Sequence, residues 1–236
     1  MKLSLSARIA EDEHRKDTTA IGFEELAKVA RDTGFSGLCI RPSQATVDTP
    51  KEVIQEMRAV LDRYGLAASM VTLDPVIATN TAEAGRPQRE IGRHLDYAEI
   101  LGATLIRIAI KDDEDVKRTR TACDEAAERG IMLLQQTHTD SPAETIEGCV
   151  DLVKRIDHES FGLTVEPGNL VLGGDEYGAE AIKQLAPHVH NVYLQNLRPS
   201  ATGVSSVPTN RGEMHYERLI VGEEGGIDLE RFFAAL

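Results

Sequence analysis

The sequence predicts an α/β fold, a TIM (β/α)8-type barrel, formed as a single domain over residues 1–236. Short β-type runs alternate along the chain with longer amphipathic segments, which is the pattern of parallel strands joined by helices. The spacing of roughly 30 residues per strand and helix favours the barrel over an open doubly wound sheet. Neither GxGxxG after the first strand nor GxxxxGK[ST] occurs, so nothing supports a nucleotide-binding open sheet.

The expected strands are short apolar or alternating runs. They are KLSLSARI (2–9), GLCIR (37–41), AASMVTL (67–73), TLIRIAI (104–110), IMLLQQTH (131–138), GLTVE (162–166) and HNVYLQN (190–196). The expected helices cover 23–34, 50–65, 89–102, 114–130, 143–157, 178–187 and 227–236. The last of these reaches the end of the chain, so the eighth strand of a closed barrel is missing. We therefore expect this chain to be a truncated form of a longer protein.

Charge and composition disfavour several functional classes. The formal net charge of −13 argues against a nucleic-acid surface, which needs a basic face to neutralise phosphates. No long apolar window or signal-peptide pattern is present, so we expect a cytoplasmic protein without a membrane segment. Three scattered cysteines without CxxC spacing indicate structural, reduced thiols.

Polar residues gather near the C-terminal ends of the expected strands, where active sites of (β/α)8 barrels lie. Strand alternation assigns these side chains to the interior: Arg8, Arg41, Thr72, Arg107, Gln136, His138, Glu166, Tyr193 and Gln195. One interpretation is a salt-bridged interior in which Arg41 or Arg107 neutralises Glu166. The excess of arginines over acids favours instead a site for an anionic ligand such as a phosphate or carboxylate.

Two loops are expected to flank this site. The segment 197–226 is too long for an ordinary connection and is interpreted as a lid, with Arg211 able to reach an anionic substrate. The charged stretch EDEHRKD (11–17) is expected to form a rim, on which His14 is a candidate ligand.

Several motifs together carry a family resemblance that spans nearly the whole chain. They are GFSGLCIR (34–41), LGATLIRI (101–108), GIMLLQQTH (130–138), GLTVEPGN (162–169), HNVYLQN (190–196) and VGEEGGIDLERFFAAL (221–236). With these motifs the chain resembles the xylose isomerase-like TIM barrels, a superfamily of sugar isomerases and epimerases that also includes the metal-dependent apurinic endonucleases. The endonuclease branch is disfavoured because its metal site needs many His and acidic ligands and because the net charge is negative.

The resemblance also implies a metal site and its ligands. Such proteins hold a divalent cation with a Glu on strand five, an Asp on strand six, a His or Gln on strand seven and a Glu on strand eight. The positions on strands five, six and seven correspond here to Gln136, Glu166 and Tyr193. The strand-eight position lies beyond Leu236. The implied Mn²⁺ or Mg²⁺ ligands are therefore Glu166, Gln136 and His138, a set with fewer carboxylates than such ions prefer. An amide takes no proton at neutral pH, so Gln136 cannot be the base of an isomerisation.

The resulting expectation is a sugar or sugar-phosphate isomerase/epimerase of carbohydrate metabolism, acting by proton transfer at a carbon next to a carbonyl. The catalytic candidates are Glu166, His138 and Gln136. The substrate-binding candidates are Arg8, Arg41, Arg107, Tyr193, Gln195 and Arg211. Two alternatives stay open: a metal-free barrel that binds a sugar-like or anionic small molecule, and a dehydratase or lyase on the same fold. The partner is expected to be a small molecule, and a homo-oligomer is left open.

Overall fold

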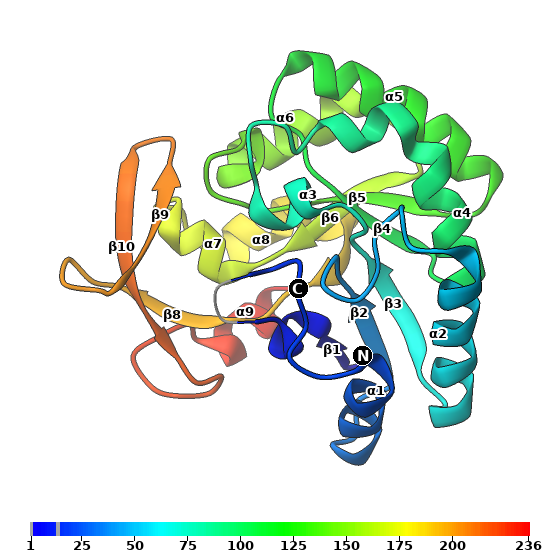
Figure 1. Ribbon diagram of the computed structural model, residues 1–236. Coiled ribbons are helices and arrows are strands. Elements are labelled where there is room, and N and C mark those ends of the chain that lie inside the picture. The colour runs from blue at the N-terminus through cyan, green and yellow to red at the C-terminus, as the bar shows by residue number, and fades with distance from the viewer. Residues whose placement is uncertain (1, 13–14) are drawn as a thin grey trace. The chain divides into compact units, whose positions relative to one another are not determined.

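The computed structural model describes residues 2–12 and 15–236; His14 lies outside the described residues (Figure 1). Its main sheet has seven strands in chain order, β1 to β7, and helices separate the strands along the sequence. The strands are β1 (Ser4–Ser6), β2 (Gly37–Ile40), β3 (Ala67–Val71), β4 (Leu105–Ile108), β5 (Met132–Gln136), β6 (Phe161–Val165) and β7 (Val189–Val192). This order of parallel strands confirms the predicted TIM-barrel type, and within the described residues the sheet ends at β7.

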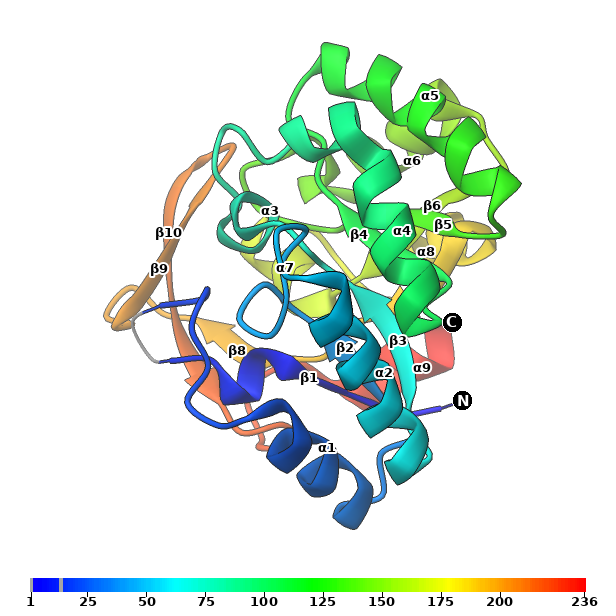
Figure 2. The same cartoon turned by 45° about the vertical axis from the view of Figure 1, so that its right-hand side comes forward.

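The chain divides into two compact units, of which the first comprises residues 1–109 and 121–133. Parallel pairing joins β1 to β2, β2 to β3 and β3 to β4. The helices α1 (Phe23–Asp32), α2 (Lys51–Tyr64) and α4 (Ile91–Leu101) pack side by side along these strands (Figure 2). Their apolar faces are fully buried, because Leu26, Ile54 and Leu95 have no exposed surface. A short helix, α3 (Pro75–Thr79), and a 3-10 turn, η2 (Arg86–Glu90), occupy the connection between β3 and α4.

Two helices of the first unit end where the sequence predicts. Gly65 and Gly102 adopt left-handed φ values of 65° and 71° directly after α2 and α4. A Cβ at either position would be strained in this conformation, which explains why glycine follows the last helical residue.

The second unit comprises residues 110–120 and 134–236. It contains the parallel pair β6 and β7, with α6 (Ile146–Ile156), α7 (Pro167–Leu172), α8 (Ala179–Leu185) and α9 (Leu229–Ala235). Short 3-10 turns lie at η3 (Pro142–Glu144) and η4 (Ala186–His188). The long helix α5 (Asp113–Glu128) has residues in both units.

The segment 197–226 is not the open lid loop that the sequence led us to expect. It contributes to a three-stranded antiparallel sheet in the order β8–β10–β9, formed by β8 (Asn196–Pro199), β9 (Ser205–Thr209) and β10 (Gly212–Leu219). Leu197 and Tyr216 of this sheet are buried against Leu172 of α7. Apolar burial therefore fixes this segment to its own unit.

Several strands are shorter than predicted, and this changes the setting of site residues. The first strand stops at Ser6, whose side chain caps the 3-10 turn η1 (Ala7–Ala10), so Arg8 lies in a turn and not in a strand. The seventh stops at Val192, so Tyr193 and Gln195 belong to the connection that follows it. Local hydrogen bonds to side chains and turns compete with strand pairing at these ends.

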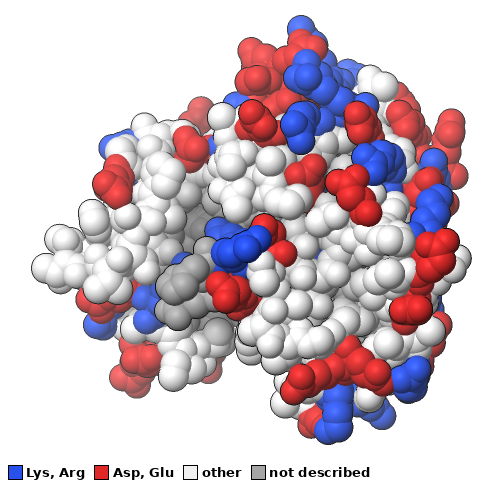
Figure 3. Space-filling view, in the orientation of Figure 1, with Lys and Arg blue, Asp and Glu red and all other residues white. Residues whose placement is uncertain are grey.

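Charged side chains are spread over the surface (Figure 3), and the cysteines lie in the interior, as the sequence led us to expect for structural thiols. On the face drawn in Figure 3, acidic and basic side chains are interspersed. Exposed i,i+4 ion pairs such as Lys28–Asp32 and Arg58–Asp62 also occur in the chain. All three cysteines are buried thiols outside any disulfide, and burial raises the pKa of the Cys123 and Cys149 thiols to about 12. No helix in the described part of the chain is both long and apolar enough to cross a membrane.

Candidate functional site

The end of β6 places a buried carboxylate among amides. Glu166 follows Val165 directly and is 7% exposed. Its Oε2 accepts hydrogen bonds from the side-chain amides of Gln136, at the end of β5, and of Asn169, at 2.8 Å. Gln195 Nε2 donates in turn to Asn169 Oδ1 at 3.2 Å. We call these four residues the amide–carboxylate network; three of them are residues that the sequence predicted for a site.

Thr137 fixes the backbone beneath this network. Its hydroxyl accepts the backbone N–H of Glu166 at 2.8 Å and lies 3.3 Å from the carbonyl oxygen of the same residue, to which it donates. Its own backbone N–H donates to Thr164 O at 2.9 Å, and its carbonyl accepts from the Asn169 amide at 2.9 Å. Since Thr137 is fully buried, the ends of β5 and β6 are held in one register at the carboxylate.

His138 begins the loop that leaves β5. Its backbone N–H donates to Ala143 O, and its ring Nδ1 lies 3.0 Å from the carbonyl oxygen of Thr139. A carbonyl can only accept, so this contact places the ring proton on Nδ1 and a lone pair on Nε2. The half-buried imidazole is therefore able to accept or return a proton through Nε2.

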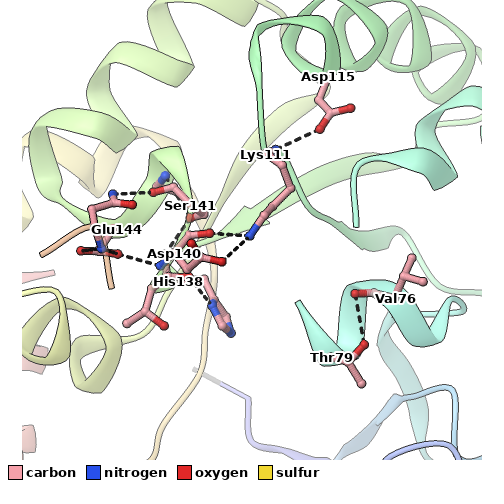
Figure 4. Close-up of polar contacts among 11 residues, drawn as sticks. Val76, Thr79, Lys111, Asp115, His138, Asp140, Ser141 and Glu144 are labelled. Atoms are coloured by element: carbon pink, nitrogen blue, oxygen red, sulfur yellow. Dashed lines mark hydrogen bonds and ion pairs between the residues drawn. The ribbon is translucent and has the colours of Figure 1, made fainter. Parts of the chain in front are cut away.

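Two charged groups hold the His138 loop in place (Figure 4). Lys111 Nζ donates to the carbonyl oxygen of Asp140 and to its carboxylate, with Nζ and Oδ2 3.0 Å apart. Glu144, which is 1% exposed, accepts the backbone N–H of Asp140 at 2.6 Å and that of Asn210 at 2.9 Å. Asn210 lies in the turn between β9 and β10, so Glu144 joins that turn to the loop.

The remaining predicted residues of the second unit differ in their position. Tyr193 is half-buried and its backbone N–H donates to Val165 O, directly before Glu166. Arg211 is exposed in the β9–β10 turn, and its guanidinium lies against Gly174 at the end of α7. A Cβ at Gly174 would lie 1.4 Å from Arg211 Nη2, so the close approach of the guanidinium depends on glycine.

The first unit holds the arginines that the sequence predicted. Arg41 and Arg107 are 3% and 5% exposed, whereas Arg8 is exposed on its 3-10 turn. Arg41 forms an ion pair with Glu11, and the two side chains are 4% and 5% exposed. Glu11, which lies in the stretch that the sequence assigns to a charged rim, is thus the carboxylate that pairs with Arg41.

Lys16 adds a further cation to this arginine cluster. Its Nζ donates to Ala78 O at 3.4 Å, although much of the side chain is exposed. Burial of the ammonium and, after it, the positive charges of Arg8, Arg41 and Arg107 together lower its pKa to about 8, while the charge of Glu11 acts in the opposite sense. The charges of these three arginines and of Glu11 therefore act on Lys16 within the first unit.

The donor set of the network does not fit a divalent cation. Amide N–H groups from Gln136 and Asn169 both donate to Oε2 of the Glu166 carboxylate, the only carboxylate of the network. Gln136 Oε1 is buried without a hydrogen-bond partner in the described structure. Nor does the described part of the chain contain a group of three or more His, Cys, Asp or Glu side chains suited to a metal ion. Mg²⁺ and Mn²⁺ prefer several oxygen ligands with carboxylate charge, and one carboxylate surrounded by N–H donors is not such a set.

The sequence model of the family described as xylose isomerase-like TIM barrel matches residues 27–236. The chain belongs to this family. This match confirms the resemblance to the xylose isomerase-like barrels that the sequence motifs indicated. No curated protein matches its sequence significantly.

Solved structures with the same fold include an epimerase and a probable dehydratase. A D-allulose 3-epimerase from Methylomonas sp. superposes with a TM-score of 0.69 at 17% identity, covering 100% of this chain and 80% of that chain. A probable 3-DHS dehydratase from Bacillus anthracis gives 0.68 at 19% identity, covering 91% and 82%. A xylose isomerase-like TIM barrel protein from Mycobacterium smegmatis in complex with magnesium gives 0.68 at 19%, covering 89% and 76%. At such identities the similarity establishes the fold of this xylose isomerase-like barrel alone.

Sequence reasoning missed several residues of the site. Asn169 stands three residues after Glu166 in EPGN, a spacing that brings both side chains to the first turn of α7, and this signal was available. Lys111, Asp140 and Glu144 carry no such local signal, because Lys111 pairs with Asp140 across 29 positions and Glu144 accepts the backbone N–H of Asn210 across 66 positions of the sequence. Lysine, aspartate and glutamate also occupy ordinary surface positions of this xylose isomerase-like barrel, so only the folded structure identifies these three residues as part of the site.

Proposed function

We propose that this chain is a sugar or sugar-phosphate isomerase or epimerase in which Glu166 is the base. The observation that carries the proposal is the buried Glu166 carboxylate, held at the end of β6 by the amides of Gln136 and Asn169. A carboxylate fixed in this way can remove a proton from a substrate carbon next to a carbonyl, which leaves an enediolate. Return of that proton to the neighbouring carbon, with transfer of the hydroxyl proton to the former carbonyl oxygen, completes an isomerisation. Delivery of a proton to the opposite face of the same carbon completes an epimerisation.

His138 is proposed as the second proton carrier. The lone pair on its Nε2 suits it to exchange a proton with a substrate oxygen or with the opposite face of the carbon. Gln136 is proposed to position Glu166 and to bind substrate, since its amide cannot transfer a proton at neutral pH. Tyr193 and Gln195, in the connection that follows β7, are proposed to bind hydroxyl groups. No step is assigned to a metal, because the donor set does not fit one.

We infer separately that the arginine cluster of the first unit binds a phosphate or carboxylate. Buried arginines present several N–H donors in a fixed geometry that matches such anions. Arg41, Arg107 and Arg8 are the proposed ligands, and Arg211 remains proposed as a ligand of the second unit.

The function is tested by solvent isotope exchange, which reports proton transfer without knowledge of the product. The protein is incubated in deuterated water with ketoses and their phosphates, D-allulose among them, and carbon-bound deuterium is measured by NMR. We expect incorporation that falls about 10²- to 10⁴-fold in Glu166→Gln, because a positioned base contributes an acceleration of that order. Exchange that is equally fast in Glu166→Gln would refute the role of Glu166, and no exchange with any sugar would refute the isomerase proposal.

A second candidate is a small-molecule binding protein on the same barrel, and the amide at position 136 is the observation that favours it. Saturable binding of a sugar without deuterium incorporation, in a protein whose Gln136→Ala variant loses that binding, would support this candidate. Loss of water from a hydroxy acid, with abstraction of the proton by Glu166 or His138, would instead support a dehydratase.

A further inference from the structure

One peptide group of the second unit links the buried Glu144 carboxylate to the ring of His138. The backbone N–H of Asp140 donates to Glu144 Oε2 at 2.6 Å. The carbonyl group of the same peptide unit belongs to Thr139, and its oxygen lies 3.0 Å from His138 Nδ1. Because a carbonyl oxygen can only accept, Nδ1 is the donor in this contact. A chain of hydrogen bonds therefore runs from the carboxylate through the Thr139–Asp140 peptide to the imidazole.

The negative charge of Glu144 strengthens this chain. Hydrogen bonds to a carboxylate are shorter and stronger than those between neutral groups, in agreement with the 2.6 Å bond. Glu144 and Thr139 are 1% and 2% exposed, and in such an environment hydrogen bonds in series polarise one another. The bond to Glu144 therefore makes the Thr139 oxygen a better acceptor. A better acceptor at this position favours the proton of His138 on Nδ1 and the lone pair on Nε2.

Asp140 holds this peptide in an unfavourable backbone conformation. Its φ is 52°, in the left-handed region, where a residue with a Cβ is strained unless surrounding contacts hold it. Glu144 holds the N–H of Asp140, and Lys111 Nζ donates to its carbonyl oxygen and to its carboxylate. Figure 4 shows Glu144 and Lys111 reaching Asp140 from opposite sides. These two charged side chains together fix the orientation of the peptide that the His138 ring contacts.

Other hydrogen bonds fix the backbone of His138 without acting on its ring nitrogens. Its N–H donates to Ala143 O at 3.1 Å, and its carbonyl oxygen accepts the Ser141 hydroxyl at 2.7 Å. These bonds place the Cα atom of His138. They leave open which ring nitrogen carries the proton, whereas the contact with the Thr139 carbonyl selects Nδ1.

We propose that Glu144 is a positioning residue, which acts through the Thr139–Asp140 peptide to keep the proton of His138 on Nδ1, and that Lys111 locks the same peptide from its other side. The value of this tautomer for catalysis rests on the proposed function, in which His138 exchanges protons through Nε2. The tautomer itself does not depend on that function and is measurable without a substrate.

The tautomer is measured by long-range ¹H–¹⁵N spectra of the full chain in alkaline buffer, in which histidine rings are neutral. The resonances of His138 are assigned from their absence in His138→Gln. In the parent protein, Nδ1 is expected to give the resonance of a protonated nitrogen and Nε2 that of a nitrogen with a lone pair. In Glu144→Gln, which replaces the charged acceptor by a neutral amide, both tautomers are expected, so the two resonances move toward each other. A parent protein with the proton on Nε2 would overturn the proposal.

Lys111 variants test the other side of the peptide. Lys111→Met removes the donor to Asp140 but leaves Glu144 in place, and the His138 resonances are expected to move in the same direction as in Glu144→Gln. Lys111→Arg keeps the charge and the donors and should restore the parent spectrum. Because Lys111→Met retains Glu144, it decides the question even if Glu144→Gln does not fold. Unchanged His138 resonances in Lys111→Met would overturn the proposal.

A control variant separates this effect from a general loss of stability. In the β9–β10 turn, Thr209 Oγ1 donates to Gly212 O at 2.7 Å and accepts the backbone N–H of Arg211 at 3.1 Å. Thr209→Val loosens the turn without altering the side chain of Glu144, so His138 should keep the parent spectrum. A shift in Thr209→Val as large as that in Glu144→Gln would refute a specific role of Glu144.

Deuterium incorporation into sugars distinguishes failure of this inference from failure of the proposed function. In an active protein, Glu144→Gln should lower incorporation at least about tenfold, since a misplaced acid–base group loses part of its usual contribution of about 10²- to 10⁴-fold. Shifted His138 resonances in a protein that exchanges no sugar proton would support the positioning role and refute the isomerase. Exchange in the parent protein with identical His138 spectra in Glu144→Gln and Lys111→Met would refute the positioning role alone.

Discussion

At the Glu166 carboxylate, the Gln136 amide supplies a hydrogen-bond donor where a metal site would have a cation, because its N–H donates to Oε2. Replacing it with glutamate would place a second carboxylate against the first and remove the donor. We expect Gln136→Glu to bind Mn²⁺ and the parent protein not to, since two adjacent carboxylates offset the charge of the ion. Manganese electron paramagnetic resonance checks this, with Gln195→Glu as the control of equal charge. Stoichiometric Mn²⁺ in the parent protein that is lost in Glu166→Ala would contradict our interpretation of the donor set.

Thr137 is predicted to contribute to stability through its hydroxyl alone. Thr137→Val keeps the volume of the side chain but leaves the buried N–H of Glu166 without its acceptor, at a cost of about 1–3 kcal/mol in the free energy of unfolding. Thr137→Ser keeps the hydroxyl and should lose less. Urea unfolding of the two variants compares them, and a valine variant as stable as the serine variant would show that the hydroxyl is dispensable.

Single residues also mark the limit of prediction from the sequence. The polar ends of β5 and β6 were predictable, because Gln136 and Glu166 follow apolar runs in an alternating register. The ion pair of Arg41 with Glu11 was not, because Glu11 stands thirty residues earlier in the chain, in a stretch without strand or helix periodicity. Alternation shows which side of a strand a residue occupies, but the choice of partner depends on how loops fold back.

At the scale of elements, the antiparallel sheet β8–β10–β9 is the main feature that sequence periodicity did not reveal. Its strands contain Pro199 and Pro208 and lie among glycines and serines, which are typical of loops. Edge strands tolerate proline, and the turn at Asn210 is closed by Gly212 with a φ of 112°. The parallel strands and their helices were predictable because each buries a strongly apolar face.

The anchor of this sheet gives a prediction for an element as a whole. Glu144 accepts two backbone N–H groups, one from the His138 loop and one from the β9–β10 turn. Glu144→Gln exchanges a charged acceptor for a neutral one that also donates, so we expect about 1–3 kcal/mol of destabilisation. Hydrogen exchange should accelerate at Asn210 and Asp140 and stay unchanged at α2, which lies in the first unit. Acceleration spread evenly over the chain would show that Glu144 does not act locally.

At the scale of the whole molecule, a net charge of −13 coexists with a cluster of cations in the first unit. The lowered pKa of Lys16, about 8, means that this lysine loses its charge as the pH rises through that value, whereas the arginines do not. Sulfate affinity is therefore expected to be highest below pH about 8 and to fall above it. Calorimetric titration of sulfate across this range checks the prediction, because sulfate itself keeps its charge. In Lys16→Met the pH dependence should disappear; if it persists, another group is responsible.

The buried thiols allow the rate at which the protein opens to be measured by their chemical modification. Cys123 lies in the first unit and Cys149 in the second, and a thiol with a pKa of about 12 does not react until it is exposed to solvent. Alkylation followed by mass spectrometry would therefore time the opening of each unit separately, without any engineered label. Equal rates at both cysteines would mean that the units open in one cooperative step, and unequal rates would identify which one opens first.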